Sequence, residues 1–318
     1  MVSVHEMHLA RARISARLHQ TPLLGSSTIA ARVGAARFDL KCESLQKTGS
    51  FKVRGVLNTL GQLSDDARAR GVVTVSAGNH AQAMAWGARA AGVKCTVVMP
   101  ANASNSKVAA SIGYGATVVQ HGTGADAFRK ALELADSEGF TFVHPFDDDH
   151  VIAGAGTTGL EIFDQTSPPD IVVVPIGGGG LIAGVAIAVK ETNPSTRVIG
   201  VEPVGANVMR QSLDAGRAMR MESMNTIADG LAAPFAGARN FDVVRRYVDD
   251  VVLVTDDEIV EAMKTLLSRC KLLSEPAGAA ATAAVLAGKI PLHGTEHVVA
   301  LLSGGNVDLE RVAQLIAE

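Results

Sequence analysis

The sequence has few cysteines, no long run of one charge and no long apolar run. Its three cysteines, Cys42, Cys95 and Cys270, are odd in number and far apart, so they form neither a disulfide framework nor a CxxC metal site. We expect each to pack as a small apolar residue, although a nucleophilic cysteine stays open. The net charge of −3 and the lack of Lys/Arg runs exclude an electrostatic surface for nucleic acid or an anionic membrane. Apolar segments such as 171–176 are far shorter than the roughly 20 residues that span a bilayer.

What the sequence does contain is enough apolar material for a large core. With 318 residues and 47 % hydrophobic content, it predicts two domains or one large α/β unit. The first 18 residues mix charged and apolar side chains, unlike a signal peptide. We therefore expect a cytoplasmic protein whose partners are a small-molecule substrate and copies of itself, in a homodimer or homotetramer.

A short β-branched run, a turn of Gly, Asn or Ser, and an Ala-rich helical stretch recur along the chain. This alternation predicts a parallel α/β fold. The clearest cases are 72–76 before a helix from about His80, 171–176 before 181–191, and 297–303 before 308–317. Further predicted strands are 95–100, 117–120, 140–144, 198–202 and 251–254. Ligands of such sheets bind beyond the carboxyl ends of the strands, so the turns are the places to search for chemistry.

The first such turn is a run of four glycines, Gly177 to Gly180. Glycine lets the backbone curl so that successive N–H groups point at one spot, and the following helix N-terminus adds partial positive charge. We interpret this turn as a phosphate cradle. Gly178, Gly180 and Ala183 also match the GxGxxA fingerprint of dinucleotide-binding proteins, with Glu202 at the end of the next strand. A nicotinamide or flavin oxidoreductase is therefore the alternative.

The segment KTGSFKVRG places Lys52 in the first turn of a predicted helix that Thr48 or Ser50 could cap. The helix dipole favours the neutral amine at that position, and a neutral amine is what forms a Schiff base with an aldehyde. Taken alone, Lys52 is still more often a solvated lysine than a catalytic one.

Two further turns follow predicted strands. In the turn SAGNH, Gly78 and Asn79 offer N–H groups to a carboxylate, and the Asn79 amide could bind a phenolic oxygen. Because no carboxylate partner for His80 is visible, we interpret this histidine as structural. In the turn SGGN, the hydroxyl of Ser303 could face a ring nitrogen. Strand ends of one sheet converge, so four such turns together indicate a binding site.

Together these motifs resemble the fold-type II pyridoxal-phosphate family, which includes threonine dehydratase, serine racemase, cysteine synthase and the tryptophan synthase β-subunit. The resemblance spans nearly the whole chain and is greatest to the threonine and serine dehydratases. It rests on the segments KTGSFKVRG, SAGNHAQ, HPFDDDHVIAGAGTTGLEI, GGGGLIAG, VEP, ADG, SEPAGA and LLSGGN. It implies two open parallel-sheet domains with pyridoxal 5′-phosphate between them. The large domain would comprise residues 1–68 and 144–318, and the small mobile domain residues 69–143.

The resemblance also implies roles for particular residues. Lys52 would form the Schiff base and act as the base at Cα, Asn79 would bond the 3′-oxygen of the cofactor, and Ser303 would bond its pyridine nitrogen. Further cofactor contacts would come from Phe51, Gly177, Gly178, Gly179, Gly180, Leu181, Gly230 and, in a supporting role, Glu275. The substrate carboxylate would lie against Ser76, Ala77, Gly78, Asn79 and His80.

A neutral Ser303 hydroxyl does not force the pyridine nitrogen to be protonated, and the resulting moderate electron sink suits β-elimination. We therefore expect an ammonia-lyase that converts L-threonine or L-serine into 2-oxobutanoate or pyruvate plus ammonia. Threo-3-hydroxyaspartate, a phenylserine-like compound or a hydroxyectoine-pathway intermediate stays open as the substrate. Serine racemase activity stays open as well, whereas intact Lys52, Asn79 and Ser303 argue against a non-catalytic cofactor-binding protein.

Two features depart from the racemases of this family. Those relatives carry a serine beside the GNH turn as the acid/base on the cofactor face opposite the lysine, whereas this chain has Ala77, so we expect little racemisation. They also bind a divalent cation through a Glu, a backbone carbonyl and an Asp, which map onto Glu202, Ala206 and Val208. Because the second carboxylate is missing, we predict no metal, with Glu202 and Ala206 as weak candidates.

Overall fold

The computed structural model describes residues 1–317 and contains two sheets. The strands are β1 Leu23–Gly25, β2 Arg37–Cys42, β3 Val72–Val75, β4 Cys95–Met99, β5 Thr117–Gln120, β6 Thr141–Phe142, β7 Ile171–Pro175, β8 Arg197–Pro203, β9 Asp250–Val254 and β10 His297–Leu302. The six-stranded sheet has the order β1-β2-β10-β7-β8-β9, and only β1 runs antiparallel to its neighbour. The four-stranded sheet, β5-β4-β3-β6, is parallel throughout.

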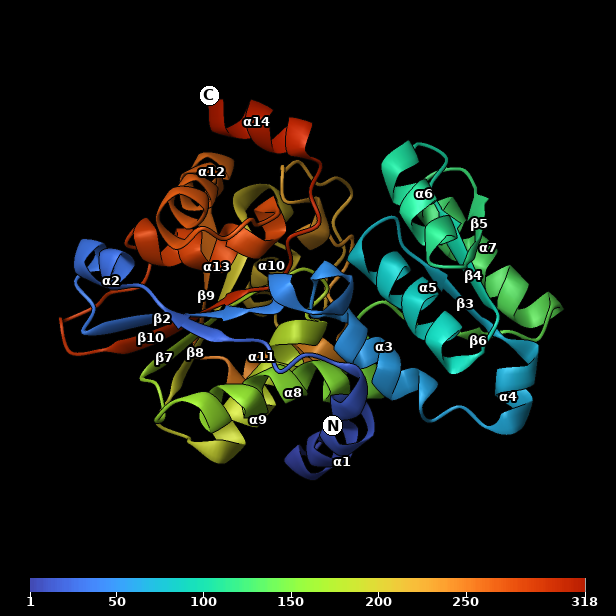
Figure 1. Cartoon of the computed structure of the whole chain (residues 1–318), viewed down its shortest axis with the longest axis horizontal. Helices are drawn as coiled ribbons and strands as arrows, with labels where there is room; N and C mark the ends of the chain where they lie inside the picture. Colours follow the sequence, from blue (N-terminus) through green and yellow to red (C-terminus); the bar gives the residue numbers. More distant parts are fainter. Residues whose placement is uncertain (318) are drawn as a thin grey trace.

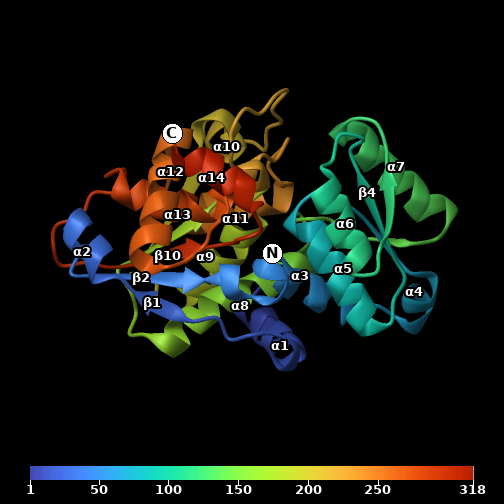
Figure 2. The same ribbon diagram turned by 45° about the horizontal axis from the view of Figure 1, so that its top comes forward.

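The described part of the chain also forms fourteen α-helices. They are α1 Val4–Ile14, α2 Ser27–Val33, α3 Lys52–Leu60, α4 Asp65–Arg70, α5 Asn79–Ala91, α6 Asn105–Gly113, α7 Gly124–Ser137, α8 Asp149–Gln165, α9 Gly180–Thr192, α10 Val208–Ala215, α11 Ala238–Tyr247, α12 Asp256–Thr265, α13 Pro276–Leu286 and α14 Leu309–Ala317. In Figure 1, α2, α12 and α13 lie on one face of the six-stranded sheet and α8, α9 and α11 on the other. Figure 2 shows α3 between the two sheets. No helix of residues 1–317 is long and apolar enough to cross a membrane.

The central strand β7 shows why the apolar runs form buried parallel strands. Side chains alternate across a strand, so Ile171 and Val173 enter the core beneath α12 and α13, whereas Val172 and Val174 enter the core with α9. All four are at most 1 % exposed. Both faces of the sheet are therefore covered, as continuous β-branched runs between Gly-rich turns predict.

The predicted fold class is confirmed, and each predicted strand is present. The strand predicted at 140–144 is shorter in the structure, where β6 has two residues. The edge strand β1 and its neighbour β2 were not predicted. In β2, the charged residues Asp39 and Lys41 interrupt the apolar pattern, yet they are 1 % and 0 % exposed.

Candidate active site

Backbone hydrogen bonds join the turn before α3 to the turn after β10. The Phe51 N–H donates to Ser303 O at 3.1 Å, and Ser50 forms an antiparallel bridge with Gly304. One residue further out, the Gly305 N–H donates to Gly49 O at 2.9 Å. These contacts bring the start of the Lys52 helix against the predicted Ser303 turn.

The same bridge explains an error in the predicted helix cap. Helix α3 begins at Lys52 with Phe51 as its N-cap and has no side-chain cap, so neither Thr48 nor Ser50 caps it. The Ser50 backbone is extended at φ −162° because it pairs with Gly304, and Thr48 has φ 61°. Within residues 1–317 the Ser50 hydroxyl has no partner.

Asn79, at the start of α5, connects the small sheet to this pair of turns. Its Oδ1 accepts from Asn306 Nδ2 at 2.8 Å, and its Nδ2 donates to Glu275 Oε1 at 2.6 Å. Asn306 Nδ2 also donates to Thr48 O at 2.7 Å. These bonds fix the orientation of the Asn79 amide, and its Nδ2 has a second N–H for a ligand.

Lys52 and Glu275 carry the charged groups of this site. Lys52 Nζ donates to Pro145 O at 2.9 Å. Burial lowers the pKa of Lys52 to about 8, and the nearby Glu275 carboxylate opposes part of this shift. Burial likewise raises the pKa of Glu275 to about 8, against the bond from Asn79. With a pKa of about 8, roughly a tenth of the amine is neutral at pH 7, far more than for an ordinary lysine, and this fraction can act as a nucleophile or base.

The glycine turn leads directly into α9, which starts at Gly180 without a side-chain cap. Gly179 has φ +97°, a backbone conformation that residues other than glycine rarely adopt. The first N–H groups of a helix have no intrahelical acceptor, so those at Gly180 and Leu181 are available to an anion. Gly178 O accepts from Asn240 Nδ2 at 2.8 Å, which holds the turn from behind.

Gly230, a further predicted cofactor contact, also lies near the glycine turn. A methyl group on Gly177 would lie 3.4 Å from Gly230 O, and one on Gly180 would lie 2.7 Å from Phe146 O. Phe146 follows Pro145, the acceptor of Lys52, so the segment HPF lies between the lysine and the glycine turn. Gly230 in turn lies against Ala277 of α13, two residues after Glu275.

The predicted substrate turn, Ser76 to His80, precedes and begins α5. Ser76 Oγ accepts from the Gly78 N–H at 3.1 Å, and a methyl group on Gly78 would have no neighbour within 4 Å. His80 is buried, with Nε2 3.0 Å from Thr74 Oγ1. Burial holds the pKa of His80 well below its ordinary value, so the ring is neutral. The His80 side chain bonds within the small sheet, as expected of a structural histidine.

Glu202 is bonded as a helix cap. Its two carboxylate oxygens accept the N–H groups of Met209 and Arg210, each at 2.8 Å, at the start of α10. Burial raises its pKa to about 8 despite these bonds. Residues 1–317 hold no cluster of three or more Asp, Glu, His or Cys side chains that could bind a metal. Ala206, the other weak metal candidate, is buried in the turn before α10.

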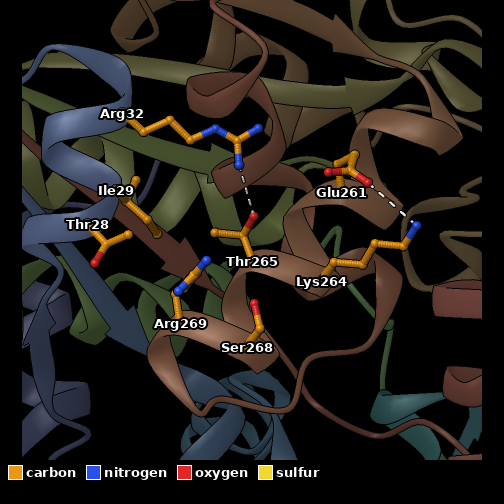
Figure 3. Close-up of a pocket in the computed structure, with 8 residues that line it drawn as sticks. All are labelled: Thr28, Ile29, Arg32, Glu261, Lys264, Thr265, Ser268 and Arg269. Carbon is orange, nitrogen blue, oxygen red and sulfur yellow. Dashed lines mark hydrogen bonds and ion pairs between the residues drawn. The ribbon is translucent and has the colours of Figure 1, made fainter.

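A cavity of about 350 Å³ lies elsewhere, between α2 and the segment at α12 (Figure 3). None of the predicted site residues lines it. Its cations are partly engaged: Arg32 donates to Thr265 Oγ1 at 3.3 Å, and Lys264 lies 3.5 Å from Glu261. The chemistry of the four turns therefore does not extend into this cavity.

Sequence reasoning assigned no role to four residues that organise the site: Pro145, Phe146, Asn240 and Asn306. Three of them were within reach, because the motifs HPFDDDH and LLSGGN contain Pro145, Phe146 and Asn306. Asn240 lies in no motif. Its role depends on a contact across 62 residues, which a local pattern does not reveal.

Comparison with known proteins identifies the family to which this site belongs. Residues 14–304 match the family described as "Pyridoxal-phosphate dependent enzyme". The chain belongs to this family. The inferred resemblance is thereby confirmed, and the cofactor is pyridoxal phosphate.

Similar proteins include an L-threonine ammonia-lyase of Thermotoga maritima, which is 43 % identical over 317 residues, 99 % of this chain and 78 % of that protein. Among solved structures, maize serine racemase matches with a TM-score of 0.94 and 39 % identity, over 99 % of this chain and 97 % of that one. A threonine deaminase from T.th. matches with a TM-score of 0.90 and 42 % identity, over 96 % of this chain and 99 % of that one. These matches confirm the fold-type II architecture.

The residues present fit this cofactor. An aldehyde requires an amine that loses its proton near neutral pH, and Lys52 supplies one. A phosphate requires converging N–H donors, and the uncapped start of α9 supplies them.

Proposed function

We propose that this enzyme eliminates water from L-threonine or L-serine and releases ammonia, forming 2-oxobutanoate or pyruvate. The observation that supports this most is the half-buried Lys52, whose amine has a lowered pKa and whose helix is hydrogen-bonded to the Ser303 turn beside Asn79. The similarity to an L-threonine ammonia-lyase and a threonine deaminase supports the substrate class.

In this proposal, residues from several segments hold the cofactor. The N–H groups from Gly177 to Leu181 would bind its phosphate, and the free Asn79 N–H would bind its 3′-oxygen. Ser303 is 4 % exposed and would face the pyridine nitrogen. Phe51, Gly230 and Glu275 would pack around the ring. When bound, the cofactor supplies the electron sink that makes the Cα–H bond of the substrate acidic.

Lys52 Nζ would then take the Cα proton, because its lowered pKa leaves part of the amine unprotonated near neutral pH. The neutral Ser303 hydroxyl would leave the pyridine nitrogen unprotonated, which favours loss of the β-hydroxyl over charge accumulation in the ring. Addition of water and loss of ammonia complete the reaction.

The N–H groups of the turn from Ser76 to His80 would bind the substrate carboxylate at the start of α5. Ala77 lies in this turn and has no group that can donate or accept a proton. We therefore propose elimination with little racemisation, because racemisation needs proton return on the face opposite Lys52.

The test is a panel of β-hydroxy amino acids assayed for 2-oxo acid release, with chiral analysis of the remaining substrate. We expect L-threonine and L-serine to be turned over, with little D-serine formed from L-serine. A preference for threo-3-hydroxyaspartate or a phenylserine would contradict the proposal that L-threonine or L-serine is the substrate. D-serine formation at a rate comparable to that of pyruvate would favour a racemase, a candidate supported by the similarity to maize serine racemase.

We further propose a cytoplasmic homodimer or homotetramer in which residues 69–143 move as a small domain. The separate four-stranded sheet supports the domain boundary. Leu45 and Leu273 are 49 % and 39 % exposed, apolar surface that an interface could cover. Analytical ultracentrifugation would distinguish a monomer from a dimer or a tetramer. Opening of the small domain would break the hydrogen bond between Asn79 and Glu275.

A further inference from the structure

Four charged side chains are buried together beside α3: Lys41, Glu43, Arg54 and Glu161. They come from β2, the turn after it, α3 and α8. Each is at most 8 % exposed. Arg54 follows Lys52 by two residues on the same helix, so it points away from the face that carries the amine.

Hydrogen bonds satisfy every donor of the two cations. The guanidinium of Arg54 makes five bonds of 2.7–3.1 Å, two to Glu43, two to Glu161 and one to Thr157 Oγ1. Lys41 Nζ makes three, to Glu161 Oε2 at 2.7 Å, Thr21 O at 2.8 Å and Gln165 Oε1 at 3.0 Å. A guanidinium has five N–H groups and an ammonium has three, so none remains for a ligand.

Stability alone does not account for such a cluster. Buried ion pairs lose much of their Coulombic gain to desolvation, and apolar replacements of similar volume are often as stable. Charged groups add a defined geometry. A planar guanidinium that binds two carboxylates in a bidentate manner fixes the positions of all three side chains. The carboxylates belong to two segments far apart in the chain, the turn after β2 and α8, so the cluster ties Arg54 of α3 to both of them.

Glycine contacts extend this arrangement from α3 to α9. A methyl group on Gly154 of α8 would lie 2.6 Å from Arg54 O, so α3 and α8 meet backbone to backbone. On the other side of α8, a methyl group on Gly184 of α9 would lie 2.5 Å from Gly156 N. The three helices thus pack without intervening side chains at these points, with Lys52 at the start of α3 and the glycine turn at the start of α9.

We propose that Arg54, held between Glu43 and Glu161, is a positioning residue that directs the Lys52 amine relative to the glycine turn and Ser303. This inference rests on the proposed function only in taking Lys52 as the residue that binds the cofactor. Arg54 itself does not touch the reacting groups, because its donors are all engaged inside the cluster.

The main test is Arg54→Lys, which keeps the charge and loses the planar fork. Three quantities are measured: the pyridoxal phosphate affinity of the apoprotein, the pH at which the visible band of the Lys52-bound cofactor titrates, and kcat and KM. We expect weaker cofactor binding, a shifted titration and a kcat lower by roughly tenfold to hundredfold, because a misplacement of about 1 Å has effects of that size. KM should change much less.

Asp39→Asn is the matched control. Asp39 lies on β2, as Lys41 does, and is 1 % exposed. It accepts from His297 Nε2 at 2.7 Å, and neither residue belongs to the cluster. The substitution should lower stability without moving the titration. If Arg54→Lys does not fold, Glu161→Gln tests the same cluster, because glutamine has the shape of glutamate and lacks its charge.

Equal behaviour of the cluster variant and Asp39→Asn, with lost stability and an unchanged titration, would overturn the inference. The affinity and the titration require no substrate, so a wrong substrate assignment leaves this result interpretable. If the wild-type protein binds pyridoxal phosphate without a visible band, it is the assignment of Lys52 that fails.

Discussion

Two groups of buried charges lie at the start of α3, and they differ in how their charges are paired. In the cluster around Arg54, burial alone would raise the pKa of Glu161, but its bonds to Arg54 and Lys41 outweigh burial and hold the pKa below its ordinary value. At the site, no ion pair joins Lys52 to Glu275 in the described residues, and burial moves both pKa values to about 8. Only a few residues separate the two environments along the chain.

This difference separates structure from chemistry. A charge whose partners are all present keeps its ordinary protonation state and fixes geometry. A buried charge without a full set of partners is poised to give up or take a proton, which is what a base or a Schiff-base lysine requires. Lys52 and Arg54 therefore have opposite tasks two residues apart, and the following changes should reveal this.

The largest effect is expected from Lys52→Ala. Loss of both the covalent attachment and the base should lower kcat by roughly 10²–10⁴-fold or more, while the fold persists. Steady-state kinetics and circular dichroism measure the two quantities. Retention of more than a tenth of the activity would assign the proton transfer to another group.

Removing one carboxylate from the Arg54 cluster and one from the site should change the free energy of unfolding by different amounts. Glu161→Ala leaves Arg54 and Lys41 buried without their shared partner, so the free energy of unfolding should fall by about 3–5 kcal/mol. Glu275→Ala removes one hydrogen bond from Asn79 and should cost about 1 kcal/mol. Urea unfolding of the two apoproteins measures both values. Similar losses would mean that the cluster and the site are stabilised alike.

The pH dependence of stability sharpens the same contrast. Glu275 has a folded pKa of about 8, raised above its ordinary 4.5, so between these pH values the folded state binds more protons than the unfolded state. The stability contributed by this proton is complete below pH 4.5 and is lost as the pH rises to 8. Glu275→Gln lacks this dependence, so the variant should gain stability relative to the wild type from pH 5 to pH 8. A constant difference across that range would show that Glu275 is ionised throughout.

The smallest effect is expected from Ser303→Ala. One hydrogen bond of roughly 0.5–1.5 kcal/mol would be lost, which corresponds to about a twofold to tenfold weaker cofactor affinity with chemistry retained. Titration of the apoprotein with pyridoxal phosphate measures it. A loss as large as that of Lys52→Ala would contradict a supporting role for Ser303.

The sequence predicted the parts of the molecule that are local. Glycine and asparagine turns after β-branched runs predict that Gly177–Gly180, Asn79 and Ser303 bind the cofactor, and the structure shows each of these turns at the end of a strand or the start of a helix. It could not predict β2, because Lys41 is made compatible with burial by Glu161, 120 residues away. The Thr48 or Ser50 cap failed for the same reason, since a long-range bridge to Gly304 replaced the local preference of serine.

The central claim is that the Lys52 amine binds the cofactor, and borohydride reduction followed by peptide mapping tests it most directly. The purified protein should be yellow, and reduction should abolish the visible band and leave the cofactor on the peptide that contains Lys52. Attachment to another lysine, such as Lys47 or Lys41, or a protein that carries a nicotinamide or flavin nucleotide and no cofactor on any lysine, would contradict the account.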